Sequence, residues 1–252
     1  MTDNKLEKVN TVIFDLDGTL LDTLEDLKDA LNYALTKHGM PCRSIAEVRC
    51  FVGNGAKELL KRAVEGGEDN LEFEAALSDF KSYYKEHSLV KTAPYNGVID
   101  VMRRLKECGY RLAIVSNKPD AAVKDLDRHF FAGLTEVAIG ESDRIAKKPA
   151  PDMVNEALEI MKSKVADITE VDAAIGGTAD VEGMAIGGSA DFKCDPINAV
   201  YVGDSEVDLM TASNSKLPCI SVTWGFRDKE FLVERGANIF VDRPEELLEL
   251  LG

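Results

Sequence analysis

The sequence has few histidines, and its cysteines lack the spacing of a metal site or a disulfide framework. The three histidines lie far apart in the chain, so we expect no clustered zinc site. The cysteines are odd in number and form no CxxC pair: Cys42, Cys50, Cys108, Cys194 and Cys219. This pattern is typical of reduced thiols rather than of a disulfide-stabilised secreted domain.

Long hydrophobic runs are also missing. No run of about 18 or more apolar residues occurs, so we expect no membrane span and no membrane partner. The first ten residues, MTDNKLEKVN, lack the apolar block of a signal peptide. The cytoplasm is therefore the expected location.

Basic residues are fewer than acidic residues. Lys and Arg total 30 against 45 for Asp and Glu, which gives a net charge of −15. Nucleic-acid binding depends on clustered Lys and Arg, so no nucleic-acid partner is expected. A small phosphate ester is not excluded, because it needs only a local cation or a metal ion. The length of 252 residues and the 45% of hydrophobic residues predict a soluble globular protein of one large or two smaller domains.

Short apolar runs recur along the chain and predict the strands of a sheet. They are continuous rather than alternating, which is typical of strands covered on both faces. The runs occupy residues 11–15, 111–116, 136–140, 198–204, 219–224 and 238–241. Amphipathic helical patterns, such as those at 97–109 and 151–164, separate most of them. This alternation predicts an α/β fold with a doubly wound parallel sheet, a Rossmann-like core.

The long segment between the first two predicted strands contains only helical patterns. They lie at 24–39, 55–66 and 71–87. Because one crossover needs far less chain, we expect a separate helical subdomain at 23–91, inserted into a core formed by 1–22 and 92–252. Its linkers would lie near 22–23 and 91–94.

A direct repeat interrupts the second half of the chain. AIGGTAD at 174–180 recurs as AIGGSAD at 185–191. Small residues and Gly-Gly pairs bury little surface, so residues 165–197 are predicted to form an inserted flexible arm or a short pair of hairpins. The arm would lie at the amino edge of the sheet, and we interpret it as a surface for self-association or partner binding rather than chemistry.

Polar side chains follow the predicted strands at the points where the strands end. The set is Asp15, Asp17, Ser116, Asn117, Lys148, Asp204 and Asp208. Ligands of open α/β sheets gather at this carboxyl edge. Carboxylates brought together there would repel each other unless a cation joined them, and an all-oxygen set beside a phosphate is the preference of Mg²⁺. The set therefore indicates phosphoryl transfer with a carboxylate nucleophile.

Each of these residues also has an ordinary explanation. An isolated Asp-x-Asp after a strand is often a turn. Asp204 and Asp208 could cap and favour the first turn of a helix, and Lys148 could be as solvated as its neighbour Lys147. Their joint occurrence at the ends of several strands favours the functional interpretation.

Four segments resemble the motifs of the haloacid dehalogenase superfamily: DLDGTLLDT, VSNK, KKPAPD and GDSEVD. The resemblance covers nearly the whole chain except 165–197. It implies that Asp15 is a nucleophile that forms a phosphoaspartate, and that Asp17 is first a general acid and then a base. It also implies a Mg²⁺ ion held by Asp15, Asp204 and the main-chain oxygen of Asp17, with Asp208 in support.

The same resemblance implies a binding cradle for the transferring phosphoryl group. The side chains of Ser116 and Lys148 would bind that group. The main-chain amides of Leu16, Asp17 and Asn117 would complete the cradle.

The helical insertion resembles the small four-helix cap that, in this superfamily, closes over the site and selects the leaving group. The segments FVGNGAKELLKRAV at 51–64 and VTWGF at 222–226 resemble phosphoglycolate phosphatases, which implies 2-phosphoglycolate as the substrate. A tight glycine turn could meet a small carboxylate there, although a plain helix-connecting turn is the alternative. The residues concerned are Gly53, Asn54, Gly55 and Lys57.

Several other functions stay open. Pyrophosphatases and sugar-phosphate phosphatases or mutases are similar members of the superfamily. A receiver-like signalling domain also gathers aspartates around Mg²⁺, but it lacks the second carboxyl group and is much shorter. A catalytically idle partner-binding protein is a third class. The expected partner is a small phosphorylated metabolite, and a homo-oligomer is left open.

Overall fold

The computed structural model describes residues 6, 8–175 and 197–252. Within these residues the main sheet has six parallel strands in the order β5-β4-β1-β6-β7-β8. They are β1 (Thr11–Phe14), β4 (Arg111–Pro119), β5 (Val137–Glu141), β6 (Ala199–Gly203), β7 (Cys219–Val222) and β8 (Phe240–Val241). Each strand coincides with a predicted apolar run. The predicted doubly wound parallel sheet is therefore confirmed.

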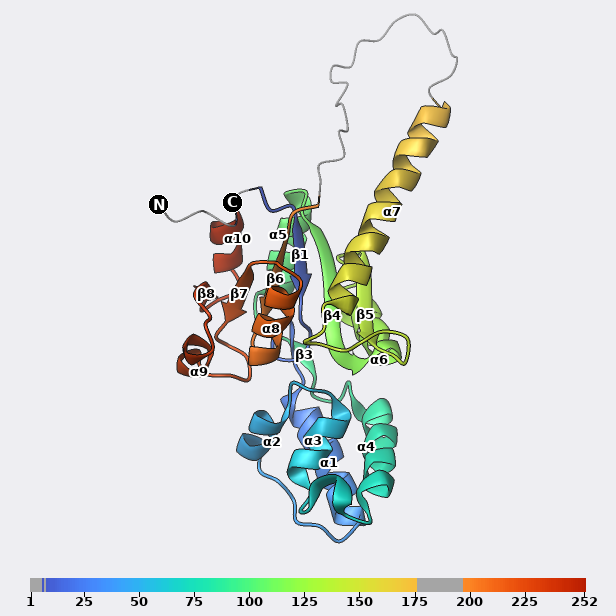
Figure 1. Cartoon of the computed structure of the whole chain (residues 1–252), viewed down its shortest axis with the longest axis vertical. Helices are drawn as coiled ribbons and strands as arrows, with labels where there is room; N and C mark the ends of the chain where they lie inside the picture. The colour runs from blue at the N-terminus through green and yellow to red at the C-terminus, as the bar shows by residue number, and fades with distance from the viewer. Residues whose placement is uncertain (1–5, 7, 176–196) are drawn as a thin grey trace, which may run out of the picture.

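Helices cover both faces of the sheet (Figure 1). Phe14 of β1 packs into a cluster that includes side chains of α5 (Val98–Glu107), α6 (Asp120–Phe130) and α10 (Glu246–Leu251). Ile13 points to the opposite face and packs with α7 (Asp152–Ile175) and α8 (Glu206–Asn214). The short helix α9 (Lys229–Glu234) follows β7. Burial on both faces explains why the strands are continuously apolar in the sequence.

The chain between β1 and β4 leaves the core as a helical insertion, which lies beyond the end of the sheet in Figure 1. Its helices are α1 (Leu24–Lys37), α2 (Ile45–Phe51), α3 (Ala56–Ala63) and α4 (Phe73–His87), with a 3₁₀ turn at Gly67–Asp69. They pack around a hydrophobic cluster of their own. Helix α2 was missed in the sequence because it is too short for a clear period. Its signal was the Ser44 and Glu47 capping box.

Two short strands join the insertion to the core. β2 (Leu21–Asp22) pairs antiparallel with β3 (Ala93–Pro94), close to the predicted linkers. The buried carboxylate of Asp26 holds the returning chain, since it accepts hydrogen bonds from the main-chain nitrogens of Lys91 at 3.0 Å and Thr92 at 2.9 Å. The division into a core of 1–22 and 92–252 and a helical cap of 23–91 stays a prediction.

Helix α7 corrects one predicted boundary. We placed the end of this helix at 164 and the start of an arm at 165, but the helix continues to Ile175. Apolar residues at 165, 168, 171 and 175 recur at helical spacing, a signal that the small and acidic residues around them obscured. The rest of the predicted arm, 176–196, lies outside the described residues. No helix in the described ranges combines the length and apolar character that a membrane span requires.

Candidate active site

The carboxyl ends of β1 and β6 bring three buried carboxylates together. Asp15 follows β1, Asp204 follows β6, and Asp208 lies in the first turn of α8. One oxygen from each lies within 4.8 Å of the others. β1 and β6 are neighbouring parallel strands, so their ends meet at one edge of the sheet. The structure thus brings together acidic residues that the sequence placed at separate strand ends.

Asp204 is held tightly by the turn after β1 and the loop after β7. Its Oδ2 accepts a hydrogen bond from the main-chain nitrogen of Phe226 at 2.6 Å, and its Oδ1 accepts one from Thr19 Oγ1 at 3.4 Å. A Cβ atom at Gly225 would lie 2.3 Å from Cβ of Asp204, and one at Gly18 would lie 2.5 Å from its Oδ2. Both positions therefore need glycine, because any side chain would push Asp204 away.

Lys148 places a positive charge among the carboxylates. Its Nζ donates hydrogen bonds to Oδ1 of Asp15 at 2.6 Å, to Oδ1 of Asp208 at 2.8 Å and to the hydroxyl of Tyr201 at 3.0 Å. Burial alone disfavours the ammonium, but the two carboxylates outweigh burial and raise the pKa of Lys148 well above its ordinary value. Oδ2 of Asp208 accepts from Ser205 Oγ at 2.6 Å, so both of its oxygens are engaged.

The carboxylates of Asp15 and Asp204 are disfavoured in their charged forms. Burial raises the pKa of Asp15 well above its ordinary value; Lys148 opposes this effect, whereas Asp208 and Asp204 add to it. Burial also raises the pKa of Asp204 to about 7, with the charge of Asp208 adding to the shift. Buried, all-oxygen ligands of this kind are the donor set that a hard divalent cation would stabilise. The residues present therefore fit a metal ion.

Ser116 and Asn117 line the same site from the end of β4. Ser116 is buried, and its Oγ accepts a long hydrogen bond from the main-chain nitrogen of Lys118 at 3.3 Å. Asn117 Nδ2 donates to the main-chain oxygen of Lys148 at 3.0 Å and to that of Gly53 in the insertion at 3.4 Å. Its Oδ1 is buried and has no hydrogen-bond partner among the described residues. The side chain of Leu16 packs in the core, which leaves only its main chain for binding.

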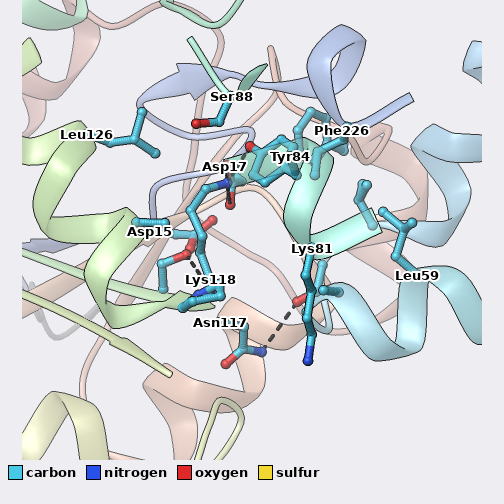
Figure 2. Close-up of a pocket in the computed structure, with 18 of the residues that line it drawn as sticks. Asp15, Asp17, Leu59, Lys81, Tyr84, Ser88, Asn117, Lys118, Leu126 and Phe226 are labelled. Carbon is cyan, nitrogen blue, oxygen red and sulfur yellow. Dashed lines mark hydrogen bonds and ion pairs between the residues drawn. The ribbon is translucent and has the colours of Figure 1, made fainter. Parts of the chain in front are cut away.

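Lys118 is a buried cation that our sequence interpretation did not single out. Its Nζ donates hydrogen bonds to Oδ1 and Oδ2 of Asp17 at 2.8 and 3.0 Å and to the hydroxyl of Tyr84 at 2.8 Å (Figure 2). Tyr84 belongs to α4, so the insertion reaches the core at this point. Burial alone disfavours the ammonium, but Asp17 and Tyr84 outweigh it and raise the pKa of Lys118. From sequence alone, a lysine beside a motif is usually interpreted as solvated. The only signal that Lys118 is buried was its position at the end of a buried strand.

Tyr201 was missed as well. It lies within the apolar run that predicted a strand, where a tyrosine is normally interpreted as a core residue. Alternation along β6 turns its side chain toward Lys148, and its hydroxyl also donates to Asp208 Oδ1 at 3.2 Å. Tyr201 thus supports the cation that holds Asp15.

The turn before α3 reaches the site through its main chain. Gly53 and Gly55 have φ values of 115° and 86°, which favour glycine, and both line the cavity. A Cβ atom at Gly55 would lie 3.2 Å from the main-chain oxygen of Asn117. The main-chain oxygen of Asn54 accepts from Lys147 Nζ at 3.3 Å. This turn therefore packs directly against the core.

Lys57 does not reach the cavity, although we expected it to meet a substrate carboxylate there. Its Nζ instead forms an ion pair with Glu68 at 2.9 Å, and about half of its side chain is exposed. It is not among the residues that line the cavity. Because α3 turns this position toward Gly67–Asp69, the lysine points along the surface of the insertion.

Two arginines connect the insertion to the loop after β7. Arg49 of α2 donates hydrogen bonds to the main-chain oxygens of Gly225 and Phe226, each at 2.8 Å. Arg227 donates in return to the main-chain oxygen of Arg49 at 2.8 Å. Since the main-chain nitrogen of Phe226 also holds Asp204, one loop fixes both a carboxylate of the site and the position of the insertion.

A cavity of about 360 Å³ lies between the insertion and the core. Asp15, Lys148 and Asp204 lie at its inner end, and residues of α4 and α6 form its outer walls. Apolar side chains contribute much of the lining, including Leu27, Val52, Leu59, Phe80, Leu89, Leu126 and Phe226. This size and lining are typical of a small-molecule site.

Known proteins resemble this chain in sequence and in fold. The chain belongs to the haloacid dehalogenase-like hydrolase family, whose sequence pattern matches residues 12–172. Over 244 residues it is 31% identical to phosphoglycolate phosphatase 1 of Pseudomonas aeruginosa, covering 94% of this chain and 78% of that protein. Over 248 residues it is 31% identical to the phosphoglycolate phosphatase of Caulobacter vibrioides, covering 96% and 92%.

A solved structure is similar over nearly the full length. It is that of a Lactobacillus delbrueckii subsp. bulgaricus protein provisionally called a phosphoglycolate phosphatase, with 33% identity and a TM-score of 0.78. The match covers 97% of this chain and 98% of that one. The predicted family and the predicted class of enzyme, a phosphoglycolate phosphatase-like hydrolase, are confirmed.

Proposed function

We propose that this protein is a Mg²⁺-dependent phosphatase that hydrolyses a small phosphate monoester, 2-phosphoglycolate in the first place, through a phosphoaspartate. The observation that carries the proposal is the setting of Asp15. Its carboxylate is buried at the end of the central strand, bonded to Lys148 at 2.6 Å and adjacent to two further carboxylates. The names of the relatives from Pseudomonas and Caulobacter support the choice of substrate.

The reaction divides into two displacements at phosphorus. In the first, an oxygen of Asp15 bonds to phosphorus while the bridging oxygen leaves and takes a proton from Asp17. In the second, Asp17 removes a proton from water, the water oxygen bonds to phosphorus, and the bond to Asp15 breaks to release inorganic phosphate. Splitting a slow hydrolysis in this way lets one positioned carboxylate attack without a free nucleophile from solution.

The remaining core residues hold the transferring group in the proposed reaction. The side chains of Ser116 and Lys148 bind its oxygens, and the main-chain amides of Leu16, Asp17 and Asn117 complete the cradle. Lys148 keeps its charge because two carboxylates surround it. Fixed positive charge of this kind stabilises the charge that builds up on the phosphoryl oxygens.

The metal ion would be held by the side chains of Asp15 and Asp204 and the main-chain oxygen of Asp17. Asp208 would act in support, since both of its oxygens already accept hydrogen bonds from Lys148 and Ser205. Bound there, Mg²⁺ supplies charge stabilisation to the transferring phosphoryl group. Residues 23–91 act as a cap over the core formed by 1–22 and 92–252, and the Gly53–Asn54–Gly55 turn contributes main-chain contacts.

Turnover assays test the proposal. Purified protein with Mg²⁺ is offered p-nitrophenyl phosphate and then 2-phosphoglycolate, pyrophosphate and several sugar phosphates. We expect repeated turnover, fastest with 2-phosphoglycolate. Faster hydrolysis of pyrophosphate or a sugar phosphate would show that this compound, rather than 2-phosphoglycolate, is the preferred substrate. One lasting phosphorylation without turnover would contradict a phosphatase and favour a receiver-like domain.

The covalent intermediate has a separate test. An Asp17→Asn variant lacks both the acid of the first displacement and the base of the second. With p-nitrophenyl phosphate the leaving group needs no proton, so only the second displacement is blocked and the phosphoaspartate should accumulate. Rapid acid quench and mass spectrometry should find one phosphoryl group on the peptide that contains Asp15. The same peptide unmodified at every time point, although substrate is consumed, would exclude the intermediate.

A further inference from the structure

Several cations line the cavity, and they differ in burial and in the groups that they contact. Lys148 is bonded to Asp15 and Asp208 at the inner end. Arg227 donates to main-chain oxygens of the insertion and to Glu206 at 3.0 Å. Lys81 and Lys85 line the outer part of the cavity and are exposed. Lys118 is buried and contacts Asp17, so it lies on the side of the cavity where the leaving group would bind.

Lys118 has its three N–H groups directed at two partners. Two acceptors are the oxygens of Asp17, at 2.8 and 3.0 Å, and the third is the hydroxyl of Tyr84 at 2.8 Å. An ammonium has three donors and no acceptor, so this set fills it. Both oxygens of Asp17 thus accept a hydrogen bond from Lys118. Its proposed role instead needs one oxygen turned toward the bridging oxygen of the substrate.

Tyr84 brings a further donor to the same place. Its hydroxyl accepts the bond from Lys118, and burial raises the pKa of Tyr84 to about 12, so the hydroxyl keeps its proton. No described residue accepts that proton in a hydrogen bond. Since Tyr84 lines the cavity from α4, this donor is available to a bound molecule.

We propose, on the basis of the function proposed above, that Lys118 and Tyr84 together bind an anionic group on the leaving alcohol, and so select phosphate esters of short 2-hydroxy acids. In such an ester the carboxylate carbon is bonded to the carbon that carries the bridging oxygen. A molecule whose bridging oxygen meets Asp17 therefore places its carboxylate within reach of the cation that contacts Asp17.

Binding of the carboxylate also changes the partners of Asp17. The substrate carboxylate accepts one hydrogen bond from Lys118 and one from the hydroxyl of Tyr84. One oxygen of Asp17 then loses its bond to Lys118 and can turn toward the bridging oxygen. An uncharged leaving group cannot compete with Asp17 for the ammonium. The core lysine and the cap tyrosine thus take the role that we first assigned to Lys57, which pairs with Glu68 instead.

The test compares two esters that differ in the charge of the leaving group. Kinetics are measured with 2-phosphoglycolate and with 2-hydroxyethyl phosphate, which has an uncharged leaving group of similar size. Wild-type kcat/KM should be higher for 2-phosphoglycolate. Lys118→Met should lower that value roughly 100-fold and lower kcat/KM for 2-hydroxyethyl phosphate less than about 10-fold, since charge-assisted hydrogen bonds to the carboxylate are lost only in the first case.

Tyr84→Phe is the second variant, and it keeps the ring while it removes one donor. It should lower kcat/KM for 2-phosphoglycolate about 10-fold and leave the other ester nearly unchanged, and it answers the question even if Lys118→Met does not fold. Lys61→Met is the matched control. Lys61 is half exposed and pairs with Glu68 at 3.0 Å, away from the cavity, so neither ester should be affected.

Equal losses for both esters in both variants would overturn the inference, because the two residues would then act only by holding Asp17. A wild-type preference for the uncharged ester would overturn it as well and leave the phosphatase proposal intact. Failure of the wild-type protein to hydrolyse any ester would overturn the proposed function, and this inference with it.

Discussion

Lys148 donates a hydrogen bond to Asp15 at 2.6 Å, although 133 positions separate the two residues in the sequence. The contact forms at the edge of the sheet where β1 ends, and both side chains are almost completely buried. It holds one oxygen of Asp15 in place and sets a permanent positive charge beside it. The candidate nucleophile is therefore oriented before any substrate arrives, which is how a fixed site lowers the cost of attack.

Removing the proposed nucleophile should lower activity more than removing the hydroxyl that is proposed to bind the phosphoryl group. Asp15→Asn should lower kcat by roughly 10⁴-fold or more, because the amide cannot form the phosphoaspartate. Ser116→Ala should cost about 10- to 100-fold, the usual effect of one hydrogen bond to the phosphoryl group. Steady-state assays of both purified variants check this order, and the reverse order would contradict the assigned roles.

A methyl group at Gly225 should weaken metal binding. Its Cβ would lie 2.3 Å from Cβ of Asp204 and 2.5 Å from the main-chain oxygen of Gly18, so Asp204 must move. In Gly225→Ala, activity should need at least about 10-fold more Mg²⁺ for half saturation, as expected when one ligand is displaced.

Gly109→Ala is the control for that variant. Gly109 has a φ of 90° but no atom within 4 Å of its would-be Cβ, so alanine strains the backbone without touching the site. It should lower Tm while the Mg²⁺ requirement stays unchanged. A normal Mg²⁺ titration of Gly225→Ala would show that Asp204 is not a metal ligand.

Loss of Arg227 should loosen the contact between the insertion and the core. Arg227→Met leaves the main-chain oxygen of Arg49 without this donor and Glu206 without its partner. We expect kcat/KM to fall about 10-fold or more and proteolysis near 91–94 to become faster, because partly buried acceptors lose their donor. Arg235→Met is the control, since Arg235 lies over the ring of Phe231 outside the site. Unchanged proteolysis in Arg227→Met would argue against a role in holding the insertion.

His38 should make the stability of the insertion depend on pH. Its ring nitrogens contact Asp79 and Glu72, each at 2.8 Å, and these hydrogen bonds raise the pKa of His38. A raised pKa in the folded state means that the contribution is fully present below the unfolded value, about 6.5, and is lost as pH rises through the folded value.

His38→Gln should therefore lower Tm more at about pH 5.5 than at about pH 8.5, as thermal melts in both buffers can show. His129→Gln is the control, because His129 contacts the ring of Phe130 and makes no ion pair among the described residues. An equal loss of Tm for His38→Gln at both pH values would contradict a charged contact.

Local sequence patterns predicted most of the fold. Continuous runs such as residues 111–116 predicted strands buried on both faces, and the longer amphipathic patterns predicted α1, α4 and α5 within a few residues. Prediction was weakest where the local signal was short or diluted. Helix α2 is only seven residues long, and the end of α7 lies in small and acidic residues.

The sequence by itself determined which strands exist and which carboxylates stand at their ends, because a buried parallel strand and its first turn are specified by neighbouring residues. Only the tertiary structure decided which cation faces which carboxylate. Lys118 meets Asp17 across 101 positions and Tyr84 across 34, while Lys57 turns away to Glu68. Such pairings depend on how the helical insertion sits against the sheet, and no local pattern records that orientation.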